Sequence, residues 1–430
     1  MAMAETPSSE RIHIAFFGMR NAGKSSVMNA FTSQSVSLVS DIAGTTTDPV
    51  KKTMELLPLG PVVLTDTAGL DDEGELGTLR VQKTHEVLEG TDIAVLVLDA
   101  TKEPCQKDYE LIATLQNKKI PFVIACNKSD VLSAEVQQEL TAKLDTKPSA
   151  PILFVSAKTN DGITELKNAV AALKPQTTGN HLVADFIHKG DVVVLVVPID
   201  NAAPKGRLIL PQQMALRDIL EAGAVPLCCT PQNLVQALEK LQEKPTLVIT
   251  DSQAFHEVNA ALPQEIPLTS FSILMSRYKG TLPSQLEGAA TLDSLNDGDR
   301  IIISEGCTHH RQCGDIGTVK IPALIKKYTG KNLNCTFTSG GDFPRSLEGI
   351  RLVIHCGGCM LTEKEMANRV ATCKAQDILV TNYGMAIAKM NGILERALAV
   401  VSVSSKKTSP LPRLEALQGR FLPAMSDGKI

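Results

Sequence analysis

The sequence predicts an α/β protein of three domains, built mainly on parallel sheets. A length of 430 residues is typical of two or three domains. Apolar, strand-like runs alternate with helix-like segments along the chain. A turn-rich stretch, residues 174–180, separates the first part of the chain from the rest. We therefore expect domains over residues 1–175, 180–265 and 266–430.

Composition and charge exclude several classes of protein. Apolar residues make up 43% of the chain and charged residues 21%, with a net charge of −4, so we expect no nucleic-acid partner. No apolar run approaches a membrane span in length, and residues 1–11 lack a signal-peptide core. The expectation is a cytoplasmic protein without membrane contact. Its ten cysteines are then expected to be thiols or metal ligands rather than disulfides.

The first domain carries a complete phosphate-binding loop. The apolar run 12–17 leads into residues 18–25, which match G-x-x-x-x-G-K-S. In this motif the backbone N–H groups cradle phosphates, the lysine reaches the β/γ-phosphates and the serine hydroxyl holds Mg²⁺. The residues expected to contact the nucleotide are Gly18, Asn21, Ala22, Gly23, Lys24, Ser25 and Ser26.

Three further motifs follow predicted strands in order. The strand 62–65 leads to Asp66 and Gly69, a metal-side carboxylate and a hinge glycine near the γ-phosphate. The strand 122–126 leads to an N-K-x-D motif whose carboxylate can accept both N–H donors of guanine. A later strand leads to S-A-K. The base-binding residues predicted from these two motifs are Asn127, Lys128, Asp130, Ser156, Ala157 and Lys158.

This motif order resembles the small GTPases, and residues 43–48 resemble the first switch of the Era-like and tRNA-modification (TrmE) branch. The resemblance implies that Thr46, or alternatively Thr45, completes the Mg²⁺ shell with Ser25 and Asp66. Leu70 stands where Ras-type enzymes have a water-orienting glutamine. Asn21 stands where the branch has an asparagine that binds K⁺, although it could simply cap the loop. We expect slow, K⁺-stimulated GTP hydrolysis with Lys24, Thr46, Asp66 and Gly69 as catalytic residues.

The middle domain shows no catalytic constellation. Residues 192–197 predict a buried strand and 212–221 a helix. Cys228 and Cys229 are interpreted as buried small apolar residues rather than ligands. A small domain without a site often serves association, so we expect a homodimer formed by this domain.

The last domain concentrates cysteine and histidine. Cys307 and His309 form C-x-H, and His355, Cys356 and Cys359 form H-C-x-x-C, with two glycines that allow a tight turn. Thiolates suit zinc or an iron–sulfur cluster; a redox pair or a buried pair is the alternative for C-x-x-C alone. Both groups follow predicted strands, at the edge where open α/β sheets bind ligands. Helices are expected over residues 363–372 and 385–397.

A GTPase domain followed by C-x-H and H-C-x-x-C resembles the [FeFe]-hydrogenase maturation GTPases, the HydF family, over the whole chain. The resemblance implies a [4Fe–4S] cluster on Cys307, Cys356 and Cys359. It also implies a di-iron precursor as cargo for apo-[FeFe]-hydrogenase, radical-SAM maturases as partners, and dimerisation through the middle domain. The fourth cluster position stays open between His309, His355, Cys313 and solvent, and the two histidines could instead lie in the second shell.

Two alternatives belong to other classes. One is a regulatory GTPase of the Era/TrmE-like branch, stabilised by zinc in a closed Cys₃His site. The other is an iron–sulfur redox enzyme that uses GTP as a gate.

Overall fold

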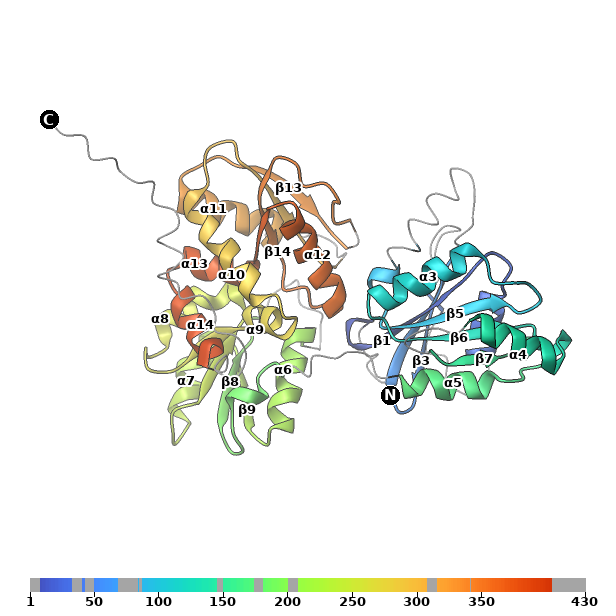
Figure 1. Ribbon diagram of the computed structural model, residues 1–430. Helices are drawn as coiled ribbons and strands as arrows, with labels where there is room; N and C mark the ends of the chain where they lie inside the picture. Colours follow the sequence, from blue (N-terminus) through green and yellow to red (C-terminus); the bar gives the residue numbers. More distant parts are fainter. Residues whose placement is uncertain are drawn as a thin grey trace. The chain divides into compact units, whose positions relative to one another are not determined.

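The protein is described here from a computed structural model, in which the chain forms two compact units, Met1–Thr178 and Gly179–Ile430 (Figure 1). The structure describes residues 8–32, 41–42, 50–68, 84, 87–144, 150–173, 181–199, 208–307, 315–340 and 342–403. The predicted linker 174–180 lies outside these residues. Within them, no helix combines the length and apolarity needed to cross a membrane.

The first unit is built on a seven-stranded sheet with the order β2-β3-β4-β1-β5-β6-β7. β3 runs antiparallel to β2 and β4, and the other pairs are parallel. The strands are β1 (Ile12–Phe17), β2 (Asp41–Ile42), β3 (Val50–Leu56), β4 (Gly60–Asp66), β5 (Ile93–Asp99), β6 (Phe122–Asn127) and β7 (Ile152–Phe154).

Helices cover both faces of this sheet, which explains why its central strands are continuous apolar runs. Along β5, Val95 and Val97 enter one core, whereas Leu96 and Leu98 enter the other. α1 (Lys24–Thr32) and α5 (Ile163–Ala172) close the first core. α3 (Gln106–Asn117) and α4 (Ala134–Lys143) close the second.

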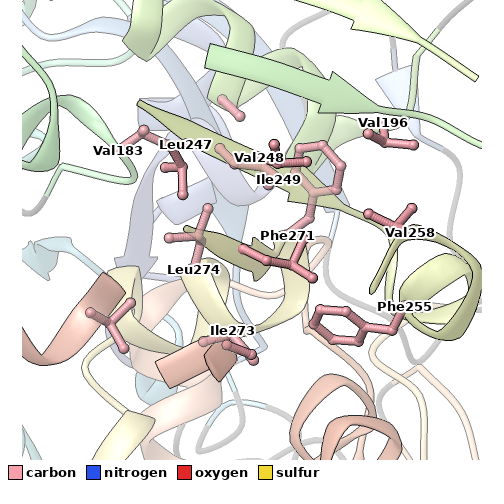
Figure 2. Close-up of a cluster of buried hydrophobic side chains, with 14 of the residues drawn as sticks. Val183, Val196, Leu247, Val248, Ile249, Phe255, Val258, Phe271, Ile273 and Leu274 are labelled. Carbon is pink, nitrogen blue, oxygen red and sulfur yellow. The ribbon is translucent and has the colours of Figure 1, made fainter. Parts of the chain in front are cut away.

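The second unit contains two parallel four-stranded sheets. The first has the order β11-β10-β8-β9. Its elements are β8 (Val192–Val196), α6 (Leu210–Glu221), β9 (Val225–Cys229), α7 (Leu234–Glu239), β10 (Leu247–Thr250), α8 (Phe255–Ala261), β11 (Leu268–Ser270) and α9 (Phe271–Tyr278). Figure 2 shows its core, where Val248 and Ile249 of β10 lie among Phe255, Phe271 and Leu274.

The other sheet has the order β13-β12-β14-β15. Its elements are α10 (Leu282–Ala290), β12 (Arg300–Ser304), a π-helical turn η7 (Ile316–Lys320), α11 (Ile321–Thr329), β13 (Asn334–Thr338), β14 (Ile350–His355), α12 (Glu363–Ala375), β15 (Leu379–Asn382), α13 (Tyr383–Met390) and α14 (Leu394–Val403). Short 3₁₀ helices in the described chain are η1 (Ser8–Glu10), η2 (Ser129–Val131), η3 (Ala184–Phe186), η4 (Pro231–Asn233), η5 (Ser252–Ala254) and η6 (Thr291–Ser294).

The prediction of an α/β architecture with mainly parallel sheets is confirmed. The helix predicted over 385–397 is wrong, since α13 and α14 are two helices. Gly392 adopts φ +70° between them, a left-handed conformation that ends a helix. The second helix, α14, returns to the first sheet of this unit, where Thr269 Oγ1 donates to the Ala397 carbonyl at 2.9 Å.

Both sheets of the second unit therefore belong to one compact unit. β11 pairs with β10 in the first sheet, although β11 lies beyond residue 265, the predicted end of the middle domain. The division into three domains at residues 175, 180 and 265 stays a prediction.

Candidate functional site

The phosphate loop follows β1, and its backbone has a positive φ at Asn21 and at Gly23. Asn21 has φ 62° and Gly23 has φ 90°. Lys24 begins α1, is only 7% exposed and donates from Nζ to the carbonyls of Gly18 at 3.1 Å and Met19 at 2.9 Å. The ammonium thus lies over the loop, where a lysine of this motif meets phosphate oxygens.

Asn127 joins the phosphate loop to the base-recognition loops. It ends β6, is 3% exposed and donates from Nδ2 to the Ala22 carbonyl at 3.0 Å. Its Oδ1 accepts from the backbone N–H of Ala157 at 3.1 Å. A Cβ on Gly23 would stand 2.2 Å from Asn127 Nδ2, so only glycine fits this contact.

Asp66 and Ser25 form the candidate Mg²⁺ site. The Ser25 hydroxyl donates to Asp66 Oδ2, while Asp66 Oδ1 is buried without a hydrogen-bond partner in the described part of the chain. Burial raises the pKa of Asp66, opposed by the hydrogen bond from Ser25 and by the charge of Lys24. A carboxylate and a hydroxyl are oxygen ligands that Mg²⁺ accepts. This donor pair, with one orphaned carboxylate oxygen, fits the predicted ion.

The N-K-x-D and S-A-K motifs meet at the carboxyl ends of β6 and β7. Ser156 Oγ donates to Asp130 Oδ1 at 2.8 Å, which orients an exposed carboxylate. Lys128 adopts φ 68° and pairs through Nζ with Asp99 Oδ2 at 2.6 Å. The sequence analysis missed Asp99, although its place at the end of β5 was a usable signal. Ser26 and Lys158 are exposed.

Several predicted site residues lie outside the described residues: Thr46, Gly69 and His309, together with Cys313. Their assignments stay predictions.

The cysteine motifs follow two neighbouring strands, β12 and β14. The backbone N–H groups of Gly306 and Gly358 donate to Cys356 Sγ at 3.1 and 3.3 Å. Gly358 has φ 64°, which explains the glycine in this turn. Cys307, Cys356 and Cys359 are all half-buried. Two adjacent turns thus bring the three thiols into one region.

The environment of these thiols opposes free thiolates. Burial raises the pKa of Cys307 to about 11 and that of Cys356 to about 12, and the neighbouring thiolates add to both shifts. Burial also raises the pKa of Cys359, opposed by Lys279. A reactive redox pair requires a depressed pKa, so these raised values argue against that alternative. Coordination to a metal would deprotonate the thiols outright.

The described residues contain no group of side chains placed to bind a single metal ion. There, no three Cys, His, Asp or Glu side chains form a group that could hold one ion. A cluster attaches each cysteine to a different iron and needs no common centre. Thiolate ligands suit a cluster and zinc alike, and His309, a candidate histidine ligand for a Cys₃His site, lies outside the described residues.

His355 is fully buried, and both of its ring nitrogens are engaged. Nδ1 lies 2.8 Å from the Cys356 carbonyl, and Nε2 lies 2.9 Å from Arg369 Nη1. Burial, followed by the charge of Arg369, lowers the pKa of His355 to about 3. The ring is therefore neutral, donating from Nδ1 and accepting at Nε2. In this arrangement neither nitrogen is available to a metal, and the second-shell role stays a prediction.

Lys279, at the end of α9, is a buried cation in this region. It is 6% exposed, and its Nζ donates to the carbonyl of Leu361. Burial lowers the pKa of Lys279. Negative charge on Cys359 would raise that pKa most, followed by the charges of Glu363, Glu365 and Cys356. The sequence analysis missed this residue, because it comes from a helix outside both cysteine motifs.

Comparisons with known proteins identify the family. A model described as "Hydrogen maturase F dimerization domain" matches residues 182–280, and one described as "Hydrogen maturase F tetramerization domain" matches 283–400. Residues 13–128 match "50S ribosome-binding GTPase", and 81–176 match "Elongation factor Tu GTP binding domain". The chain belongs to the hydrogen maturase F (HydF) family. Its first unit is an Era/TrmE-like GTPase domain, as the sequence predicted, and residues 182–280 and 283–400 match the family's oligomerisation domains.

Individual relatives align with the GTPase domain. GTPase Der of Mycoplasmopsis pulmonis is 32% identical over 171 residues, which span 37% of this chain and 39% of the relative. The tRNA modification GTPase MnmE of Desulfotalea psychrophila is 34% identical over 161 residues, 37% of this chain and 34% of the relative. The chain therefore spans little more than a third of these relatives. An Aquifex aeolicus Era variant bound to GDP·AlF₄⁻ matches 51% of this chain and 92% of its own, at 19% identity and a TM-score of 0.31.

Proposed function

We propose that this protein is a GTP-hydrolysing scaffold that holds a [4Fe–4S] cluster on Cys307, Cys356 and Cys359 and delivers a di-iron precursor to apo-[FeFe]-hydrogenase. The supporting observation is the meeting of three thiols at the ends of β12 and β14, with two N–H donors on Cys356 Sγ. Hydrogen bonds to cysteine sulfur are a feature of cluster sites.

The nucleotide site supplies the GTPase part of the proposal. Lys24 would exchange its two carbonyl partners for β/γ-phosphate oxygens, which neutralises charge that develops on phosphoryl transfer. Ser25 and Asp66 would hold Mg²⁺, and Asp130 would select guanine. Thr46 and Gly69 are proposed as the switch residues that respond to the γ-phosphate.

The cytoplasm is the proposed location, with a homodimer as the working form and the radical-SAM maturases and apo-hydrogenase as partners. The rival functions are the zinc-stabilised regulatory GTPase and the GTP-gated redox enzyme.

Anaerobic purification followed by reconstitution with iron and sulfide tests the proposal. We expect a brown protein with about four irons per chain, thiolate-to-iron absorption and an EPR signal on reduction, and we expect it to activate apo-hydrogenase once loaded by the maturases. A colourless protein with stoichiometric zinc would favour the regulatory GTPase. A protein that binds a cluster and catalyses electron transfer, but never activates apo-hydrogenase, would favour the redox enzyme.

The proposed K⁺ site predicts a cation-dependent rate. Asn21 is exposed at the loop with φ 62°, and a K⁺ beside it would stabilise charge in the transition state. Hydrolysis should be about tenfold or more faster in K⁺ than in Na⁺ at equal ionic strength, and Asn21→Ala should abolish the difference.

Asn21→Gly is the matched variant, because glycine accepts the left-handed backbone without strain. It removes only the amide and should also abolish the difference. Equal rates of the unaltered protein in both salts would reject the K⁺ role.

The proposed dimer predicts that β9 is an interface. β9 is an edge strand, and Val225 on it is 53% exposed. Cys228 is exposed as well, so the expectation that it is buried is wrong. An exposed apolar edge strand can pair with another chain, and charge blocks such pairing. Val225→Lys combined with Cys228→Lys should convert dimers to monomers in light scattering of the full chain.

Val136→Lys is the control, since Val136 is similarly exposed, at 42%, but lies on α4 of the first unit. It should leave the mass unchanged. A double variant that stays dimeric at low micromolar concentration would place the interface elsewhere.

A further inference from the structure

α9 lies along the cysteine turn. Near its start, the Cα of Ser272 is 3.7 Å from where a Cβ on Gly357 would stand, and the Ser272 carbonyl accepts from Asn382 Nδ2 at 3.0 Å. At its end, Lys279 donates to the Leu361 carbonyl. The helix therefore contacts the chain both between and just beyond the two cysteines of H-C-x-x-C, and it carries a buried cation to that turn.

A buried ammonium needs a partner, because desolvating a charge is costly. Within the described chain, the Leu361 carbonyl is the one acceptor of Nζ, and no carboxylate forms an ion pair with it. Glu365 is engaged at the start of α12, where it accepts from the backbone N–H of Thr362 at 2.7 Å. Leu361 lies two residues beyond Cys359, so the hydrogen bond to its carbonyl holds the Lys279 ammonium at the end of the C-x-x-C turn.

The other buried cation near the thiols has different partners. Arg369 donates to His355 Nε2 and to the Gly340 carbonyl, and its guanidinium lies 5.2 Å from the centre of the Phe343 ring. It is thereby occupied in holding His355. Lys279 remains the cation of the described chain that is directed at the C-x-x-C turn.

We propose that Lys279 is a positioning residue of the cysteine site, which compensates the negative charge of the thiolates and raises the reduction potential of the cluster they hold. This inference rests on the proposed function, because it requires a cluster. It also assigns a contribution to the site from the region that matches the dimerization-domain model, which ends at residue 280. A nearby positive charge favours the reduced cluster because reduction adds one negative charge.

Three variants separate charge from fold. Lys279→Met removes the charge and keeps the length, Lys279→Gln keeps an N–H donor without the charge, and Lys279→Arg keeps the charge. Each is made in the full chain, reconstituted with iron and sulfide, and checked by circular dichroism and iron content. The midpoint potential is then measured by EPR-monitored redox titration. Arg277→Met is the matched control, since Arg277 lies on the same helix but pairs with Asp185.

We expect the Met and Gln variants to bind iron but to have a lower midpoint potential than the unaltered protein. The equilibrium constant for reduction should fall tenfold or more, which corresponds to about 59 mV or more for one electron. The Arg variant and the Arg277 control should keep the potential of the unaltered protein. Neutral variants with an unchanged potential would overturn the inference, as would an Arg variant shifted as far as they are. Neutral variants that fail to fold while Lys279→Arg folds would show that the charge serves the fold, and would also overturn it. If the unaltered protein binds no cluster, the proposed function itself fails.

Discussion

Replacing Cys356 by serine is expected to remove the cluster altogether. The Cys356 sulfur accepts N–H groups from both cysteine turns. A serine hydroxyl is a harder and shorter donor than a thiolate and suits iron–sulfur clusters poorly. Because even outer-shell partners of a metal contribute about 10–100-fold in affinity, loss of a ligand should lower the affinity for the cluster by more than this and leave the protein without iron.

Cys307→Ser and Cys359→Ser should give the same result, because each leaves a cubane with two cysteines. Iron and sulfide analysis with EPR of the reduced protein measures all three, and activation of apo-hydrogenase should disappear in parallel. Cys335→Ser is the matched control: Cys335 is also half-buried, on β13 of the same sheet, but outside the two motifs. Full iron content in any of the three ligand variants would remove that cysteine from the proposed site.

The sequence predicted those functional motifs whose residues all lie in one loop directly after a strand. Gly18 to Ser25, Asn127 to Asp130 and His355 to Cys359 could each be recognised locally, because every residue of the motif comes from one turn. The parallel sheet then brings separate turns together, so the meeting of Cys307 with Cys356 followed from predicting β12 and β14 as parallel strands.

Partners supplied by remote segments could not be predicted in this way. Lys279 and Arg369 come from helices that no motif connects to the cysteines, and each is an ordinary basic residue in its local sequence. His355 was a natural candidate ligand by spacing, yet Arg369 occupies its Nε2. The same limit applies to the fold: β11 pairs with β10, and α14 packs against β11 although Ala397 lies 128 residues beyond Thr269 along the chain. Such a contact depends on packing rather than on periodicity.

Asp130→Asn is expected to change the nucleotide that the first unit binds. The Asp130 carboxylate is exposed and oriented by Ser156 Oγ at 2.8 Å, so both oxygens can face a base held over Asn127. An asparagine keeps one acceptor and replaces the other with a donor, which conflicts with the paired N–H donors of guanine. Losing a charge-assisted pair costs roughly 2–5 kcal/mol, or about 30-fold to about 5,000-fold in GTP affinity.

Xanthine offers a carbonyl where guanine has its amino group, so the asparagine amide can donate to it. Asp130→Asn should therefore bind xanthosine triphosphate more tightly than GTP, as measured by calorimetry or by displacement of a fluorescent nucleotide. Ser156→Ala is the control: it removes the hydroxyl that orients the carboxylate but keeps the charge, so it should weaken GTP binding only by the roughly 0.5–1.5 kcal/mol of one hydrogen bond and leave the preference for guanine. Unchanged GTP affinity in Asp130→Asn would mean that this carboxylate does not contact the base, and the guanine assignment would then have to move to another residue of the β6 and β7 loops.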